Sequence, residues 1–281
     1  MVKSFLPDII NNWKGALYKG MQHVIVIAGT SDARQIIEGL ARKGIRVTAT
    51  VATDFGGSLI ETGGGVSVLD GRLCAGEMAR LVEETGAKCV VDASHPYAAE
   101  ASSNAISACR LANVPYYRFE RACTLSQDKN IIWAGDFHKA AQKADEFDGN
   151  VFLTVGSNNI EVFARTIRNS KKRLFARVLP QSEVILRCEQ AGLDASSIIA
   201  AKGPFSPEMN IEMLKHCKAA VMVAKDSGAQ GGTPQKLLAC ADVGIPVIMV
   251  RRPELEYTNK TGSIDELLEA VVRTASLKGG G

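Results

Sequence analysis

A regular alternation of strand-like and helix-like segments is the feature of this sequence that most limits its fold. Residues 23–28 (HVIVIA) have the composition of a buried strand, and residues 32–43 follow with Ile36, Ile37 and Leu40 at helical spacing. The same pairing recurs along the chain with short connections. Such a sequence predicts parallel sheets with helices on both faces, the doubly wound α/β class of Rossmann-like folds.

The alternation divides into two series, which indicates two domains. The predicted strands are residues 23–28, 46–51, 66–69, 88–92 and 116–119 in the first series, and 131–134, 151–154, 174–179, 198–200, 219–224 and 246–250 in the second. A polar stretch without periodicity, residues 121–130, separates them. A chain of 281 residues is long enough for two compact domains. We expect an extension outside the fold at 1–20, an N-terminal nucleotide-binding Rossmann-like domain at 21–125 and a C-terminal Rossmann-like domain at 126–281, facing a central cleft.

Composition and spacing exclude several classes of protein. No apolar run approaches the roughly 20 residues that cross a bilayer, and Pro7 and Asp8 interrupt the apolar patch at residues 5–10, so no secretory signal is expected. A net charge of +3 without a basic block among aromatics argues against nucleic-acid binding. The seven cysteines are scattered without a Cys-x-x-Cys pair and there are four histidines, so we expect no metal site and a reducing, cytoplasmic location.

The turn after the first predicted strand is a candidate phosphate site. Thr30 or Ser31 can cap the next helix, and the N–H groups exposed there can receive a phosphate. Only the first glycine of the G-x-G-x-x-G fingerprint is present, so an ordinary capped turn fits equally well. Asp32 suits the helix dipole but would repel a close pyrophosphate. The residues expected to bind a cofactor are Gly29, Thr30, Ser31, Ala33 and Arg34, with Thr53 after the second strand and Ser94 and Pro96 after the fourth.

The segment Asp92–Tyr97 (DASHPY) follows the fourth predicted strand, at the sheet edge where open α/β proteins bind ligands. The ordinary imidazole pKa lies close to neutrality, so His95 is the candidate general acid. Asp92 could orient it or could cap the next helix. The imidazole could instead fix the turn or hold an amide group of a bound ligand. Asp92 and His95 are the candidate catalytic residues.

Basic residues recur at the predicted strand ends of the second half. Arg177, Lys202, Lys225 and Lys236 all fall at or just beyond a strand end. This coincidence favours an anionic ligand over a solvated surface, because ligands of parallel sheets bind beyond the carboxyl ends of the strands. The run Thr154–Ser157 (TVGS) opens a helix after a strand and could be a second anion cradle.

Taken in order, these strand-end runs resemble the precorrin-6A reductase family of cobalamin biosynthesis. The matching runs are GTSDAR (Gly29–Arg34), DASHPYA (Asp92–Ala98), YRFER (Tyr117–Arg121), TVGS (Thr154–Ser157), ARVLP (Ala176–Pro180), KGPFS (Lys202–Ser206), KDSG…GG…K (Lys225–Lys236) and RRP (Arg251–Pro253). The resemblance implies reduction of a double bond in precorrin-6A, or in its cobalt-bound form, with NADPH or NADH as hydride donor. The second strand ends at Thr53 without the acid that holds an adenine ribose, and no basic cluster replaces it, so the two cofactors are not distinguished.

The implied substrate is an anionic tetrapyrrole, whose acetate and propionate groups need Arg and Lys partners. The residues expected to bind it are Tyr97, Ser102, Asn104, Arg118, Arg121, Thr154, Gly156, Ser157, Arg177, Lys202, Gly203, Pro204, Phe205, Asn210, Lys225, Ser227, Gly228 and Lys236. Any cobalt would arrive with the substrate. We expect a monomer or small homo-oligomer without nucleic-acid or membrane partners. Two other functions fit the architecture: a nucleotide-dependent two-domain transferase, and a non-catalytic two-lobed small-molecule binding protein.

Overall fold

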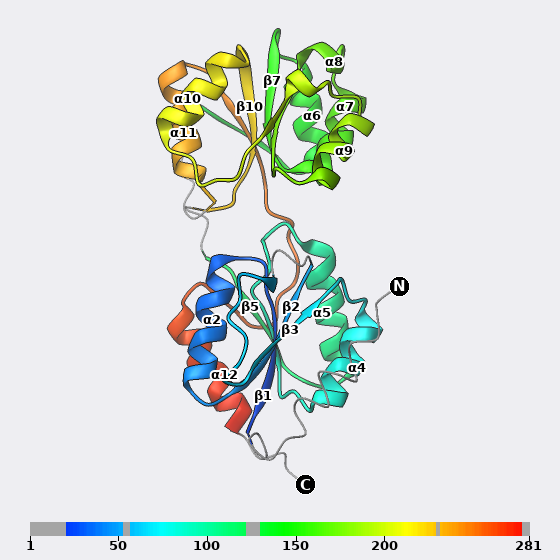
Figure 1. Ribbon diagram of the computed structural model, residues 1–281, viewed down its shortest axis with the longest axis vertical. Coiled ribbons are helices and arrows are strands. Elements are labelled where there is room, and N and C mark those ends of the chain that lie inside the picture. The colour runs from blue at the N-terminus through cyan, green and yellow to red at the C-terminus, as the bar shows by residue number, and fades with distance from the viewer. Residues whose placement is uncertain (1–20, 53–56, 122–129, 229–230, 277–281) are drawn as a thin grey trace. The chain divides into compact units, whose positions relative to one another are not determined.

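Two separate α/β units make up the computed structural model, which describes residues 21–52, 57–121, 130–228 and 231–276 (Figure 1). The first unit contains the described residues of Met1–Ala122 and of Glu254–Gly281. The second unit contains those of Cys123–Pro253. The chain therefore leaves the first unit, builds the second and then returns.

The sheet of the first unit is parallel throughout its described strands, which lie in the order β12-β5-β4-β1-β2-β3. These strands are β1 (His23–Ile27), β2 (Arg46–Val51), β3 (Val66–Asp70), β4 (Val90–Asp92), β5 (Tyr116–Phe119) and β12 (Lys260–Thr261). When the strands are numbered within the unit and read from β3 to β12, this is the order 3-2-1-4-5-6 of dinucleotide-binding Rossmann sheets. The order reverses between β1 and β4, and ligands of such sheets bind beyond the strand ends at that reversal.

Helices cover both faces of this sheet because each has one apolar side to bury. They are α2 (Ser31–Arg42), α4 (Ala75–Thr85), α5 (Ala99–Leu111) and α12 (Ile264–Ser276). α2 and α12 share one core with the sheet, while α4 and α5 share the core on the opposite face. Figure 1 shows the two pairs on either side of the strands. The predicted helical side of α2, formed by Ile36, Ile37 and Leu40, is buried.

The second unit is also built on a six-stranded sheet that is parallel throughout the described strands, but its strand order differs: β6-β11-β10-β7-β8-β9. These are β6 (Ile131–Ala134), β7 (Asn150–Thr154), β8 (Leu174–Val178), β9 (Ile198–Ala200), β10 (Ala219–Lys225) and β11 (Val247–Val250). Here the order reverses between β7 and β10. The residues that follow these two strands therefore lie where a ligand of this unit would bind.

The helices of the second unit also lie on both faces of the sheet (Figure 1). They are α6 (Phe137–Asp145), α7 (Ile160–Thr166), α8 (Ser170–Arg173), α9 (Ser182–Gln190), α10 (Pro207–His216) and α11 (Thr233–Val243). α10 and α11 bury Leu214, Ala239 and Cys240 in one core with β7, β10 and β11. α6 and α7 bury small and aromatic side chains on the other face, Ala141 and Phe163 among them.

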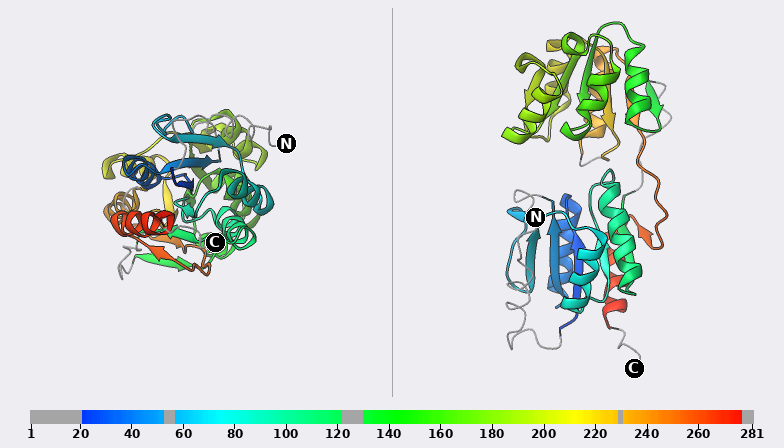
Figure 2. Two further views of the ribbon diagram at one scale, coloured as in Figure 1. Left: turned by 90° about the horizontal axis from the view of Figure 1, so that it is seen from below. Right: turned by 90° about the vertical axis from the view of Figure 1, so that its right-hand side faces the viewer.

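The predicted fold class of two doubly wound parallel-sheet units is confirmed, but residues 254–276 differ from the expected domain division. They belong to the first unit, not to a C-terminal domain at 126–281. β12 pairs with β5 through Lys260 and Arg118, and α12 packs against α2. The segment after Pro253, orange in Figure 2, leads back into this sheet. A strand of two residues has no periodicity, so the sequence pattern could not indicate this return.

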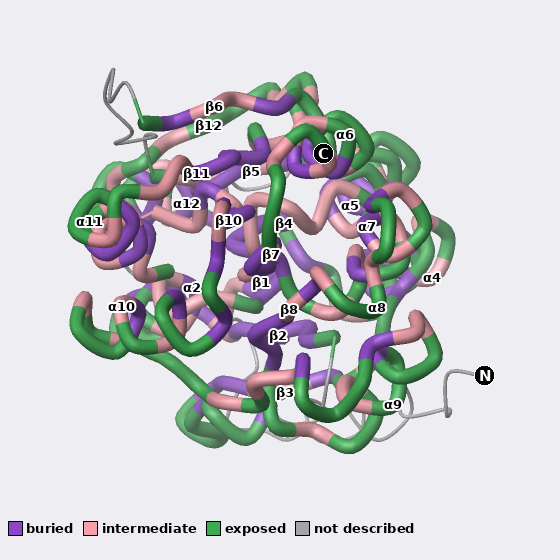
Figure 3. The backbone as a smooth tube through the Cα atoms, turned by 90° about the horizontal axis from the view of Figure 1, so that it is seen from above, coloured by how far each residue is buried: buried purple, intermediate pink, exposed green. Residues whose placement is uncertain are grey.

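The central strands are the most buried elements of both units. Figure 3 shows β1, β2 and β10 largely buried, while the outer turns of helices and the connecting loops are exposed. Every residue of β1 is buried, which explains its continuous apolar run, because a central parallel strand is covered on both faces. Across the described residues, no helix combines the length and apolar character needed to span a membrane.

Candidate functional site

The turn after β1 is fixed by the Thr30 side chain. Thr30 is the N-cap of α2, and its hydroxyl accepts a hydrogen bond from the Ala33 N–H at 3.1 Å. The same hydroxyl donates to the Ala93 carbonyl after β4, at 3.0 Å. Thr30 therefore joins the two loops that flank the reversal of strand order.

The charges at the start of α2 are balanced in a way that the sequence did not reveal. Arg121 pairs with Asp32 at 2.8 Å, so the carboxylate that would repel a phosphate is neutralised. The Arg34 side chain has no hydrogen-bond or ion-pair partner among the described residues. The expected contact from Ala33 needs correction, because its side chain is buried and its N–H is taken by Thr30.

His95 is presented by a turn in which the backbone is extensively bonded. The Ala98 N–H donates to the His95 carbonyl at 2.8 Å, and the Tyr97 N–H donates to the imidazole Nδ1 at 3.3 Å. A nitrogen that accepts a hydrogen bond carries no proton, so the ring proton lies on Nε2. In this neutral ring Nε2–H is the donor and Nδ1 the acceptor. A β-carbon added at Gly29 would lie 3.7 Å from the His95 nitrogen, so Gly29 faces this turn.

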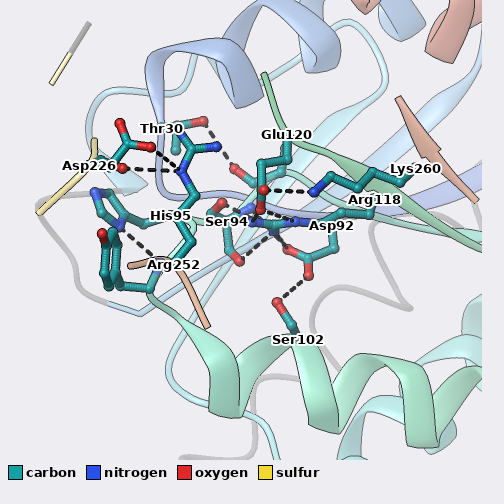
Figure 4. Close-up of polar contacts among 12 residues, drawn as sticks. Thr30, Asp92, Ser94, His95, Ser102, Arg118, Glu120, Asp226, Arg252 and Lys260 are labelled. Carbon is teal, nitrogen blue, oxygen red and sulfur yellow. Dashed lines mark hydrogen bonds and ion pairs between the residues drawn. The ribbon is translucent and has the colours of Figure 1, made fainter. Parts of the chain in front are cut away.

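Asp92 does not orient His95, because four other groups occupy its carboxylate; Figure 4 shows two of them, Arg118 and Ser102. Oδ1 accepts from Arg118 at 2.9 Å and from the Ser94 N–H at 3.0 Å. Oδ2 accepts from Ser102 at 2.6 Å and from Tyr116 at 2.7 Å. The expected roles of Asp92 in catalysis and of Arg118 and Ser102 in substrate binding are corrected: these side chains are buried and bonded to one another.

The ion pairs continue outward from Arg118 to Glu120 and Lys260. Arg118 donates to Glu120 at 2.9 Å, and Lys260 donates to the other Glu120 oxygen at 2.8 Å. Burial opposes the charge on Arg118, but the nearby carboxylates outweigh it and raise the Arg118 pKa. Burial likewise opposes ionisation of Glu120, but hydrogen bonds from Lys260 and Arg118 lower its pKa overall. Two cations and two carboxylates thus form a charge-balanced set, which we call the ion-pair quartet: Asp92, Arg118, Glu120 and the exposed Lys260.

Sequence reasoning missed Glu120, Lys260 and Tyr116 in this network. The signal for Glu120 was present, since Glu120 directly follows β5 and comes two positions after Arg118, the spacing at which side chains of an extended chain point to the same side. Nothing comparable indicated Lys260, which reaches Glu120 from 140 positions further along the chain.

Three cations gather beside the reversal point of the second unit: Arg177, Lys225 and Lys236. Arg177 and Lys236 are each 7% exposed. Arg177 donates to the Asn210 side-chain oxygen at 2.7 Å, and Lys236 donates to the Gly231 carbonyl at 3.2 Å. Within the part of the chain that the structure describes, neither forms an ion pair with a carboxylate. We call these three residues the cation cluster.

The pKa values of the cation cluster reflect the cost of burying like charges together. Burial lowers the pKa of Lys236 to about 8, assisted by repulsion from Arg177 and Lys225. Burial also lowers the pKa of Arg177 to about 10 and depresses that of Lys225. A bound anion would relieve this repulsion and gain charged hydrogen bonds, so the cluster is suited to carboxylate or phosphate groups.

Loops after β7 and β10 frame the cation cluster. Gly156 has a left-handed φ of 79°, and a β-carbon added there would lie 3.9 Å from the Lys225 Nζ. The Thr154 hydroxyl donates to the Val223 carbonyl, joining β7 to β10. Asp226, next to Lys225, pairs with Arg252 at 3.0 Å. The glycine turn therefore lies beside the Lys225 ammonium.

The remaining predicted residues belong to segments that follow strands of the two units. The segments after β1 and β4 in the first unit contain Ser31, Pro96 and Tyr97, and the segments after β7 and β10 in the second unit contain Ser157, Ser227 and Gly228. An exposed loop after β9 contains Lys202, Gly203 and Pro204. Asn104 donates to the Leu73 carbonyl. Asn210 is 1% exposed and holds Arg177, which corrects its expected contact with substrate. Thr53 lies outside the described residues, among which no group of three or more metal-ligating side chains is found.

Comparisons with known proteins agree on one family. A family model described as precorrin-6x reductase CbiJ/CobK matches residues 23–272. The chain is 38% identical over 250 residues to the cobalt-precorrin-6A reductase of Priestia megaterium, which covers 89% of this chain and 98% of that protein. It is 36% identical over 254 residues to that of Methanothermobacter thermautotrophicus, with coverage of 89% and 83%.

More distant matches are consistent with this. The precorrin-6A reductase of Rhodococcus erythropolis is 26% identical over 264 residues, covering 92% of this chain and 99% of that protein. A solved structure named CobK precorrin-6A reductase matches with a TM-score of 0.74 at 22% identity, over 90% of this chain and 97% of that one. The structural match supports the fold.

Proposed function

The chain belongs to the precorrin-6x reductase CbiJ/CobK family, and we therefore propose that it reduces cobalt-precorrin-6A with NADPH or NADH in cobalamin biosynthesis. The cobalt-bound form is favoured because two relatives named for it are 38% and 36% identical to this chain, against 26% and 28% for two relatives named precorrin-6A reductase. The structural observation that carries the proposal is the cation cluster, which suits a substrate with several carboxylates.

The first unit is the proposed cofactor site. Its strand order is that of dinucleotide-binding sheets, and the turn between β1 and α2 offers backbone N–H groups at a helix N-terminus. The Asp32–Arg121 pair removes the repulsion that a phosphate would otherwise meet, and Arg34 adds a cation on the same helix. The donor chemistry therefore fits a dinucleotide. When bound, a nicotinamide cofactor supplies the hydride.

The second unit is the proposed site for the substrate carboxylates. Arg177 can bind a carboxylate through two parallel hydrogen bonds, while Lys225 and Lys236 act as point charges. Asn210 and Phe205 hold the Arg177 guanidinium in place before a ligand arrives. A side chain already held in position loses less conformational entropy on binding.

His95 is proposed to bind rather than to donate the proton. Reduction of the double bond adds a hydride to one carbon and a proton to the other. A protonated imidazole would place a hydrogen on Nδ1, facing the Tyr97 N–H that Nδ1 now accepts from. The neutral ring instead offers Nε2–H as a hydrogen-bond donor to a carbonyl or carboxamide oxygen.

The proposal is tested by incubating the purified chain with cobalt-precorrin-6A and either NADPH or NADH. We expect the reduced cofactor to be consumed in step with a product two mass units heavier than the substrate. Thermal protection by nucleotide sugars, without reduction, would favour the transferase. Tight binding of cobalt-precorrin-6A without turnover would favour the binding protein.

A further inference from the structure

The backbone of the turn that carries His95 is bonded at nearly every polar group before His95 is reached. The Ala93 N–H donates to the Ile27 carbonyl, and the Ala93 carbonyl accepts from Thr30. The Ser94 N–H donates to Asp92. The Ser94 carbonyl and its hydroxyl oxygen both accept from Arg118, each at 3.2 Å. Arg118 is thus the side chain that holds Ser94 from the sheet side.

One nitrogen of Arg118, Nη1, donates to three oxygens, two on Ser94 and one on Asp92. It lies 2.9 Å from the Asp92 Oδ1 and 3.2 Å from each of the two Ser94 oxygens (Figure 4). The Nε and Nη2 atoms of the same guanidinium are turned to Glu120. Since Glu120 is itself held by Lys260, the guanidinium is fixed at both of its edges. A planar group with fixed hydrogen-bonding directions restricts Ser94 far more than a point charge could.

Arg118 cannot reach a ligand itself, because its side chain is fully buried. Its position affects a ligand through the next residue along the turn, whose imidazole is partly exposed. We propose that Arg118 is a positioning residue for His95, acting through Ser94 to aim the imidazole Nε2–H at the bound ligand. This inference rests on the proposed function, in which His95 binds cofactor or substrate.

The first experiment observes His95 directly and needs no substrate. The chain has four histidines, so its imidazole nitrogens can be resolved by ¹⁵N NMR. In the wild type we expect His95 as the Nε2–H tautomer. His23 is an internal reference of opposite kind, because its Nδ1 donates to the Thr85 carbonyl and its Nε2 accepts from Thr48. In Arg118→Lys we expect the His95 signals to shift or broaden as the tautomers mix, with the His23 signals unchanged.

The second experiment separates positioning from general stability through a double-mutant cycle. Arg118→Lys is expected to raise the KM for the ligand that His95 binds by about tenfold, as His95→Asn does. In the double variant the two effects should not add, because Arg118 acts through a side chain that is no longer present. Tyr117→Phe is the matched control. It removes a partly buried hydrogen bond to Thr274 from the neighbouring position of β5 and does not touch the turn.

Additive effects in the double variant would overturn the proposal, as would unchanged His95 signals in a folded Arg118→Lys protein. If Arg118→Lys does not fold, Ser94→Ala is the second variant, since it removes one Arg118 acceptor and leaves the ion-pair quartet intact. It should shift the His95 signals, and unchanged signals would again count against the proposal. Altered signals in a protein that lacks reductase activity would uphold the positioning role and reject the proposed function.

Discussion

The Arg177 guanidinium carbon lies 4.1 Å from the centre of the Phe205 ring, while a nitrogen of the same group bonds to Asn210. The charge is therefore held by a ring face and an amide oxygen, both uncharged. An aromatic face stabilises a cation by roughly 0.5–2 kcal/mol, less than a buried carboxylate partner would. Arg177 is thus held in place with most of its charge still to be balanced, as expected of a group that awaits an anion.

Arg177→Gln should weaken substrate binding and spare the cofactor. A charged hydrogen bond contributes roughly 1.5–3 kcal/mol, so the KM for the tetrapyrrole should rise about tenfold or more. Steady-state kinetics with each reactant varied in turn would measure this. Lys215→Gln removes the same charge from an exposed position on α10 and serves as the control. An equal change in both variants would show a long-range charge effect in place of a contact.

Lys236 should make the ligand-free protein more stable as the pH rises from about 8 to about 10.5. The native pKa is about 8 and the ordinary value is 10.5, so over this window the unfolded chain binds more protons than the native one. Below pH 8 the buried Lys236 charge lowers the free energy of unfolding by roughly 3 kcal/mol relative to its value above pH 10.5. We therefore expect Lys236→Met to be more stable than the wild type at pH 7, with the gap closing as the pH rises. Urea denaturation at several pH values would measure it.

The same Lys236 charge should make the protein responsive to polycarboxylates. At pH 7 a tricarboxylate such as citrate should raise the melting temperature of the wild type and raise that of Lys236→Met less. Replacing citrate with chloride at equal ionic strength controls for screening. Equal shifts in the two proteins would place the anion elsewhere.

His23 should make the first unit sensitive to acid. Burial lowers its pKa from 6.5 to about 4. The unfolded chain therefore binds more protons than the native one between these values, so stability falls as the pH drops from 6.5 towards 4. The loss should approach roughly 3 kcal/mol at pH 4. Urea denaturation at several pH values should show no such acid-dependent loss of stability in His23→Gln. The control variant His138→Gln, at an exposed position of α6, should lose stability with acid as the wild type does.

His95→Asn should raise a KM more than it lowers the rate at saturation. General acid catalysis contributes roughly 10²–10⁴-fold to a rate, whereas a lost hydrogen-bond donor mainly weakens binding. Pre-steady-state reduction followed across pH would distinguish the two. A hundredfold loss of rate with its pH dependence abolished would instead identify His95 as the proton donor.

Gly29 offers a graded test of the cofactor site. A β-carbon there would meet the Ser94–His95 backbone at 3.7–3.8 Å, which is ordinary contact, so Gly29→Ala should bind NAD(P)H nearly normally. The branched side chain of Gly29→Val would press on that turn, and cofactor affinity should fall with the fold retained. Fluorescence titration would measure both variants. Normal affinity in a folded Gly29→Val protein would place the nucleotide elsewhere.

The sequence was most informative where structure depends on neighbouring residues. Hydrophobic periodicity located both sheets, and residue type and position narrowed the helix cap to Thr30 or Ser31, of which Thr30 is the N-cap. It was least informative where contacts join distant segments. Arg118 was expected to meet substrate because it lies in the run YRFER, which carries the family resemblance, but Asp92 and Glu120 bind it inside the protein. Spacing along the chain cannot distinguish a cation that meets a ligand from one that meets a carboxylate 26 positions away.

The discontinuity of the first unit has a consequence during synthesis. β12 and α12 leave the ribosome after the whole of Cys123–Pro253, a delay of roughly ten seconds at typical elongation rates. Throughout that interval β5 has an open edge, the apolar side of α2 lacks the cover of α12, and Glu120 lacks Lys260. The second unit, by contrast, is continuous and can fold as soon as it emerges. The nascent chain therefore completes its later unit first, and the first unit closes last.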